Sequence, residues 1–119
     1  MPLDPMDIVP HYEFWLDGIR TAALNARLLL QLAGQPVSLA NIARIMESAP
    51  HRRSDVHDEH WRECSFCSQC LKAAHQAQPR DNRIDGIASY FLDYFPQRTV
   101  VAKYMLIDAF VGIRQAMEG

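Results

Sequence analysis

Residues 10–36 read PHYEFWLDGIRTAALNARLLLQLAGQP, and this stretch decides the fold class. Its apolar residues recur at alternating spacings of three and four, which is the period of an α-helix with one buried stripe. The members of this stripe are Tyr12, Trp15, Ile19, Ala22, Ala26, Leu29 and Ala33. A second, leucine-rich face begins at Leu24, so the later half of the helix should be buried on more than one side. Gly34 favours a left-handed cap and Pro36 prevents continuation, so the helix should end just before them.

Prolines divide the rest of the chain into further stretches with helical spacing. Proline suits the first turn of a helix but breaks its interior, so each proline indicates a boundary. The expected helices cover residues 10–33, 38–49, 54–78, 82–95 and 100–117. The sequence contains no strand-like alternation and no internal repeat. We therefore predict an all-α protein, with a single compact domain of about five helices over residues 10–119 and an N-terminal extension over residues 1–9.

The composition is that of an ordinary globular domain. Of 119 residues, 49% are apolar and 22% are charged, which argues against a disordered chain. The net charge of -2 means that nucleic-acid binding would require cations concentrated on one face. No apolar run approaches the ~20 residues that span a bilayer, and the first residues lack the pattern of a signal peptide. Three cysteines, an odd number, fit a reducing cytoplasm better than a disulfide framework, so we expect a cytoplasmic protein.

One segment gathers the side chains that bind metals most often. Its histidines and cysteines are His57, His60, Cys64, Cys67, Cys70 and His75. On a continuous helix His57 and Cys67 would be about 15 Å apart along the axis, whereas two ligands of one zinc ion lie about 4 Å apart. One helix could therefore supply only a neighbouring pair, such as His60 and Cys64. We favour a structural role in which the cysteines pack as small apolar side chains, with a zinc-binding regulatory protein as the alternative; a redox or metal role for Cys64, Cys67 and Cys70 stays open.

No arrangement of a nucleophile, a base and an orienting acid is recognisable, so we predict no enzymatic activity, no catalytic residues and no cofactor. A helix-turn-helix is a second alternative, with residues 38–46 as its first helix. The connection to the next helix is longer than the usual three to four residues. That next helix begins with Asp55, Asp58 and Glu59, which would repel phosphate. A DNA-binding regulator would have to rely on Arg52, Arg53, Arg80 and Arg83.

Aromatic side chains give the clearest signal of function, because Tyr, Trp and Arg are the preferred anchors of protein interfaces. The candidate interface residues are Tyr12, Trp15, Ile19, Tyr90, Tyr94 and Tyr104. We assign Phe91, Phe95 and Phe110 to the core instead. Five short helices with broad apolar faces offer more apolar surface than one small core can enclose. We therefore predict a homodimer that forms through the first or the last helix.

The long opening helix with Tyr12-Glu13-Phe14-Trp15 and the block Tyr90-Phe91-Leu92-Asp93-Tyr94-Phe95-Pro96 add to this picture. With its length and its Arg- and Ala-rich helices, the whole chain resembles the QslA family, small helical quorum-sensing antiactivators of pseudomonads. The resemblance implies a dimeric protein without enzymatic activity. It also implies binding to the ligand-binding domain of a LuxR-type transcription activator, displacement of the activator's own dimer partner, and loss of DNA binding. No motif assigns individual contact residues.

Overall fold

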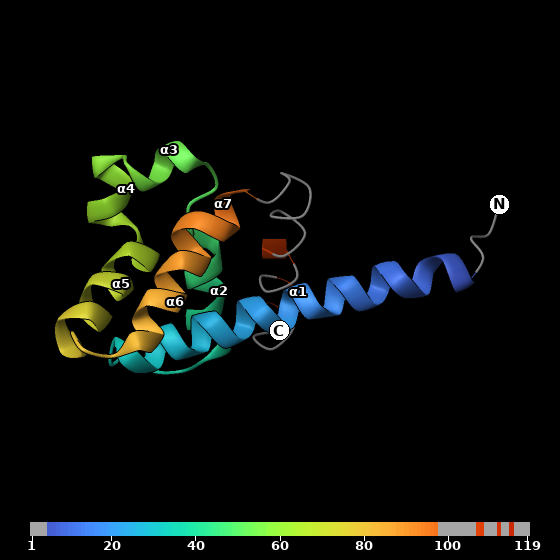
Figure 1. Ribbon diagram of the computed structural model, residues 1–119, viewed down its shortest axis with the longest axis horizontal. Coiled ribbons are helices and arrows are strands. Elements are labelled where there is room, and N and C mark those ends of the chain that lie inside the picture. Colours follow the sequence, from blue (N-terminus) through green and yellow to red (C-terminus); the bar gives the residue numbers. More distant parts are fainter. Residues whose placement is uncertain (1–4, 98–106, 109–111, 113–114, 116–119) are drawn as a thin grey trace.

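The computed structural model describes residues 5–97, 107–108, 112 and 115, with side chains from Gly18 onward within these ranges. Every element in the described residues is helical, which confirms the all-α class (Figure 1). The elements are α1 (Pro5–Leu32), α2 (Leu39–Ser48), α3 (Arg53–Val56), α4 (Glu59–Cys64), α5 (Phe66–Ala77), α6 (Asn82–Ser89), the π-helix η1 (Tyr90–Tyr94) and α7 (Phe95–Gln97). Since α6, η1 and α7 follow one another without a break, they form one continuous helix. Most of the expected last helix, including Phe110, lies outside the described residues.

Helix α1 begins earlier than the sequence predicted. It starts at Pro5 and runs through Pro10, so residues 5–9 of the predicted extension belong to the same helix. Proline has no N–H, so this helix lacks the bond from residue 10 to the carbonyl of Met6 and continues without it. The predicted end is confirmed: Gly34 has a φ of 73°, and the Gln35 N–H donates to the Leu30 carbonyl at 2.9 Å.

The first half of α1 projects from the rest of the molecule (Figure 1). Residues 5–17 form this projecting part, which we call the α1 arm. The radius of gyration of the Cα atoms is 15.3 Å, whereas a compact chain of this length would have about 13.5 Å. The arm lengthens the molecule along its long axis, which raises the radius of gyration above the value of a compact chain.

The predicted helix over residues 54–78 is wrong as a single element, because the chain turns twice within it. Asp58 accepts a hydrogen bond from the His60 N–H at 3.0 Å and begins α4. Ser65 accepts one from the Ser68 N–H at 3.0 Å and begins α5. Asp and Ser side chains satisfy the unpaired amides at a helix start, so they can begin a new helix in a stretch without Gly or Pro. The chain therefore changes direction between α3 and α4 and again between α4 and α5 (Figure 1).

Pro96 does not break the helix where the sequence predicted. The chain widens into the π-helix η1 directly before it, with the Phe95 N–H donating to the carbonyl of Tyr90, and α7 continues through Pro96 to Gln97. Proline lacks the N–H that the regular hydrogen-bond ladder requires, and the irregular turn lies at that point. The π-helix contains Tyr90 and Tyr94, two aromatic residues of the predicted interface.

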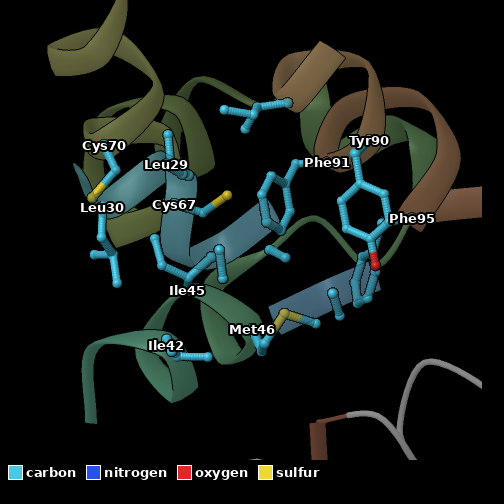
Figure 2. Packing of buried hydrophobic residues seen from close by; sticks show 14 of the residues in the cluster. Leu29, Leu30, Ile42, Ile45, Met46, Cys67, Cys70, Tyr90, Phe91 and Phe95 are labelled. Carbon is cyan, nitrogen blue, oxygen red and sulfur yellow. The ribbon is translucent and has the colours of Figure 1, made fainter. Parts of the chain in front are cut away.

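The core is one cluster of apolar side chains from α1, α2, α5 and the α6–η1–α7 helix (Figure 2). Helix α1 packs against α2, α5 and α6 through its second half. The leucine-rich face predicted from Leu24 onward is only partly buried, because Leu24 itself is 65% exposed. The largest fully buried side chains are Phe91, Phe95, Leu29, Leu30, Ile45, Met46, Pro50 and Cys67. This confirms the assignment of Phe91 and Phe95 to the core.

Ser48, the last residue of α2, holds two other helices in place. Its hydroxyl accepts a hydrogen bond from the Cys67 N–H at 2.9 Å and donates to the Arg44 carbonyl at 2.6 Å. Its carbonyl accepts from the indole Nε1–H of Trp61 at 2.8 Å. The amide of Cys67 lies in the first turn of α5, where no intrahelical acceptor exists. Ser48 therefore caps α5 from another helix and anchors α4 at the same point.

Replacing Ser48 by Ala should destabilise the protein by about 1–3 kcal/mol, because the amide of the buried residue Cys67 would lose its acceptor. Urea denaturation followed by circular dichroism measures this loss. The control is Ser89→Ala, an exposed serine on α6, which should change stability by less than about 0.5 kcal/mol. Equal unfolding midpoints for the two variants would show that the Ser48 hydroxyl does not hold α5.

Candidate functional site

The α1 arm carries two of the predicted interface residues, Tyr12 and Trp15, whose side chains lie outside the described part of the structure. Further along the helix, Ile19 is half-buried and packs against the core, and Ala22 is the first α1 member of the core cluster. The apolar stripe of the sequence thus begins on the arm, before the body of the molecule covers the helix (Figure 1).

The next two candidates, Tyr90 and Tyr94, are the first and last residues of the π-helix η1 and differ in burial. Tyr90 is only 7% exposed and belongs to the core, so its side chain offers almost no surface to a partner in this structure. Tyr94 is 53% exposed, and its ring centroid lies 5.6 Å from that of Tyr90. Tyr90 in turn contacts Phe91, edge to face, at 5.0 Å between centroids. Tyr94 is therefore an exposed aromatic side chain resting on a buried aromatic cluster, which limits the rotamer entropy it would lose on binding. The last candidate, Tyr104, lies outside the described residues.

The histidine–cysteine segment spreads over α4, α5 and the turns before them. Cys64 is exposed at the end of α4, whereas Cys67 and Cys70 are buried in α5. The described residues contain no group of three or more His, Cys, Asp and Glu side chains that could hold a metal ion. The prediction that Cys67 packs as an apolar side chain is confirmed, but the prediction that Cys64 does so is wrong, because Ser65 ends α4 and leaves Cys64 at the surface.

The two buried thiols are held in their protonated form. Burial raises the pKa of Cys67, and the neighbouring Cys70 raises it further. Burial also raises the pKa of Cys70, while the positive charge of Arg44 partly offsets this effect. The guanidinium of Arg44 lies 3.8 Å from the ring centroid of Phe66, a cation–π contact across the α2–α5 junction. Since the thiolate is the reactive form of cysteine, this environment suits structural thiols better than catalytic ones.

A groove that the sequence did not reveal lies between α3, α4, α5 and η1. Its volume is about 440 Å³. The lining residues, which we call the basic groove, are Val56, His57, Trp61, Arg62, Ser68, Leu71, Lys72, His75 and Leu92. Four of them are apolar, four are basic or imidazole side chains, and none is acidic. A sequence signal for it existed in the capping residues Asp58 and Ser65, which bend the segment.

The geometry offers little support for a helix-turn-helix. The helix after α2 is α3, which has four residues, about one turn. A recognition helix presents several side chains along the major groove and needs more length than this. The carboxylate of Asp55 accepts from the backbone amides of His51 and Arg52, each at 3.1 Å, so it fixes the start of α3.

The chain matches no known protein family, no curated protein and no solved structure when compared with each. None of the described helices combines the length and the apolar character needed to cross a membrane. Any function must therefore be argued from the arm, the exposed aromatic side chain and the groove.

In the folded protein, one thiol per chain should react rapidly with Ellman's reagent, and two more should react only after denaturation. Cys64 is exposed, while Cys67 and Cys70 are buried with raised pKa values. Cys64→Ser is the matched variant and should abolish the rapid phase without changing the slow one. Two or more rapid thiols in the folded wild-type protein would contradict the described packing of α5.

Proposed function

We propose that this protein is a non-enzymatic, protein-binding regulator: an antiactivator that binds a LuxR-type quorum-sensing transcription activator, disrupts the activator's dimer and so prevents its binding to DNA. The observation that carries the proposal is the α1 arm, a helical segment with an aromatic stripe in its sequence that projects from the body (Figure 1). The resemblance to the QslA family supplies the class of partner. The helical, strand-free architecture of the described residues is compatible with that resemblance.

The length of the arm supports a role in association. Residues 5–17 extend for about 20 Å as an α-helix. Isolated helices shorter than about 12–15 residues are marginal in water, and most helical stability in proteins comes from packing an apolar face. A partner that covers the stripe of Tyr12 and Trp15 would supply that packing. Either a second copy of this chain or an activator protomer can do so.

The exposed side chain of Tyr94 is the candidate for a second point of contact with the partner protein. It is one of the few large apolar side chains exposed on the described surface, with Leu24, Val37 and Leu39. Tyrosine and tryptophan are enriched among the few residues that supply most of the affinity of protein interfaces. To displace an activator's own protomer, the inhibitor must bind the separated protomer with comparable free energy at working concentrations. The effect should therefore be stoichiometric and overcome by excess activator.

The chain alone should form a homodimer through α1 or through residues 100–117, which the sequence predicts to be the last helix. Sedimentation velocity at micromolar concentration should give about 27 kDa, twice the chain mass of 13.6 kDa. The reason is the apolar stripe that the sequence places on the arm, since helices with broad apolar faces offer more apolar surface than one small core can enclose. Trp15→Ala should shift the distribution toward monomer if α1 is the contact. A clean monomer for the wild-type protein at this concentration would contradict the proposed self-association.

Mixing the protein with a purified LuxR-type activator should reduce the activator dimer and its operator binding together. Size-exclusion chromatography with light scattering follows the first change, and an electrophoretic mobility shift follows the second. Trp15→Ala and Tyr94→Ala should each weaken the contact by about 2 kcal/mol or more, about thirtyfold in affinity. Tyr94→Phe keeps the ring and serves as the matched control, with circular dichroism to verify that each variant folds.

Three results would count against the antiactivator. If the activator keeps its size and its operator in the presence of excess inhibitor, the partner class is wrong. A shift of the duplex by this protein alone would favour the DNA-binding alternative. A tightly held equivalent of zinc, with unfolding on chelation, would favour the metal-binding one.

A further inference from the structure

We propose that the basic groove binds an amphiphilic anion, a small molecule with an apolar tail and a single carboxylate or comparable anionic head group. This inference goes beyond the proposed regulation of an activator and does not depend on it. The observation that carries it is the pairing of an apolar floor with a cationic rim in one groove.

The floor is formed by Val56, Trp61, Leu71 and Leu92, which are all half-buried. They come from four different elements, α3, α4, α5 and η1, and the bond from Trp61 to the Ser48 carbonyl fixes one side of the floor. The groove volume of about 440 Å³ falls within the range of small-molecule sites, about 300–1,000 Å³. An aliphatic tail placed here would remove apolar surface of both partners from water.

The rim supplies the charge. Arg62 and Lys72 line the groove together with His57 and His75. The Lys72 ammonium donates one hydrogen bond to the Arg62 carbonyl at 2.7 Å, which holds its nitrogen at the α4–α5 corner. An ammonium has three donors, so two others can point to an anion. Hydrogen bonds between such a charged donor and a carboxylate are among the stronger ones in proteins.

Nearby carboxylates do not neutralise this rim by direct contact. Glu59 and Glu63 line a neighbouring depression that also involves Arg62 and Lys72. In the described part of the chain, however, the one ion pair within 4 Å joins Arg83 and Asp81, neither of which lines the groove. Both rim cations are therefore available to an anionic ligand, and a cationic amphiphile with the same tail would be disfavoured.

The test is isothermal titration of the full chain with dodecanoate below its micellar concentration. We expect saturable binding of one dodecanoate per chain, with affinity falling about two- to fourfold for each methylene removed from the tail. Dodecyltrimethylammonium, which has the same tail and the opposite charge, should bind at least about tenfold more weakly. In ¹H–¹⁵N spectra the shifts should concentrate at Val56, Trp61, Leu71 and Leu92.

The sharpest variant is Arg62→Gln. The backbone carbonyl of Arg62 accepts the bonds from Ser68 and Lys72, so this change removes the side-chain charge and leaves those bonds in place. We expect dodecanoate to bind about tenfold more weakly, the loss of one charged hydrogen bond. Arg27→Gln, at an exposed arginine on α1 outside the groove, is the matched control and should bind as the wild type does.

Several outcomes would overturn the proposal. These are the absence of saturable dodecanoate binding, equal binding of the cationic amphiphile, and equal affinities for Arg62→Gln and Arg27→Gln. Binding to vesicles of phosphatidylglycerol and phosphatidylcholine without binding of monomeric dodecanoate would instead assign the groove to a lipid surface. No activator is present in any of these measurements, so their failure leaves the antiactivator proposal to its own test.

Discussion

The hydrogen bonds of Ser48 determine how the middle of the chain is arranged. Helix α2 ends at this residue, and its hydroxyl and carbonyl bind α5 and α4 through Cys67 and Trp61. Both bonds satisfy groups at helix ends that would otherwise be unpaired, so they stabilise the junction and specify it at once. The segment with α3 and α4 has no fully buried side chain of its own, so hydrogen bonds help to attach it. Besides the bond from Trp61 to Ser48, the α5 side chains of Ser68 and Lys72 donate to the Arg62 carbonyl of α4. These bonds fix one side of the groove.

Much of the fold could be predicted from hydrophobic periodicity, and the differences have local causes. Periodicity locates α1 and α2 because a long amphipathic helix repeats its signal over several turns. It cannot locate the breaks at Asp58 and Ser65. Each break depends on a single side-chain hydrogen bond to a backbone amide, which replaces the helical bond that this amide would otherwise donate. The proline rule is confirmed at Pro36, Pro50 and Pro79, each of which follows the end of a helix. It is wrong at Pro10 and Pro96, where the chain loses one hydrogen bond and the helical turn continues through the proline.

The candidate site was less predictable, because exposure is a property of the packed molecule. Tyr90 and Tyr94 are four residues apart, and regular helical spacing would place them on neighbouring positions of one face. In the structure one is buried and the other lies on it at the surface. The basic groove needs Leu92 of η1 beside Leu71 of α5 and Val56 of α3, a juxtaposition that no spacing in the sequence encodes. The cysteines illustrate the same point, since one cap residue separates exposed Cys64 from buried Cys67.

The proposed regulation gives this chain two contacts, one with a second copy of itself and one with an activator protomer, and α1 is a candidate for both. If the α1 arm forms the contact between two copies of this chain, the same apolar stripe is covered in the homodimer and cannot simultaneously bind an activator protomer. Binding the activator then requires dissociation of the inhibitor dimer, and the free energy of self-association is subtracted from the affinity for the activator. Inhibition would then depend on the concentrations of both proteins, because each dimer competes with the mixed complex. If self-association uses the C-terminal stretch instead, the arm remains available and a dimeric inhibitor can hold two activator protomers. The core already uses the second half of α1, so the arm is the part of this helix that we expect to contact a partner. Whether the dimer must dissociate before it binds an activator therefore depends on whether the self-contact occupies the arm.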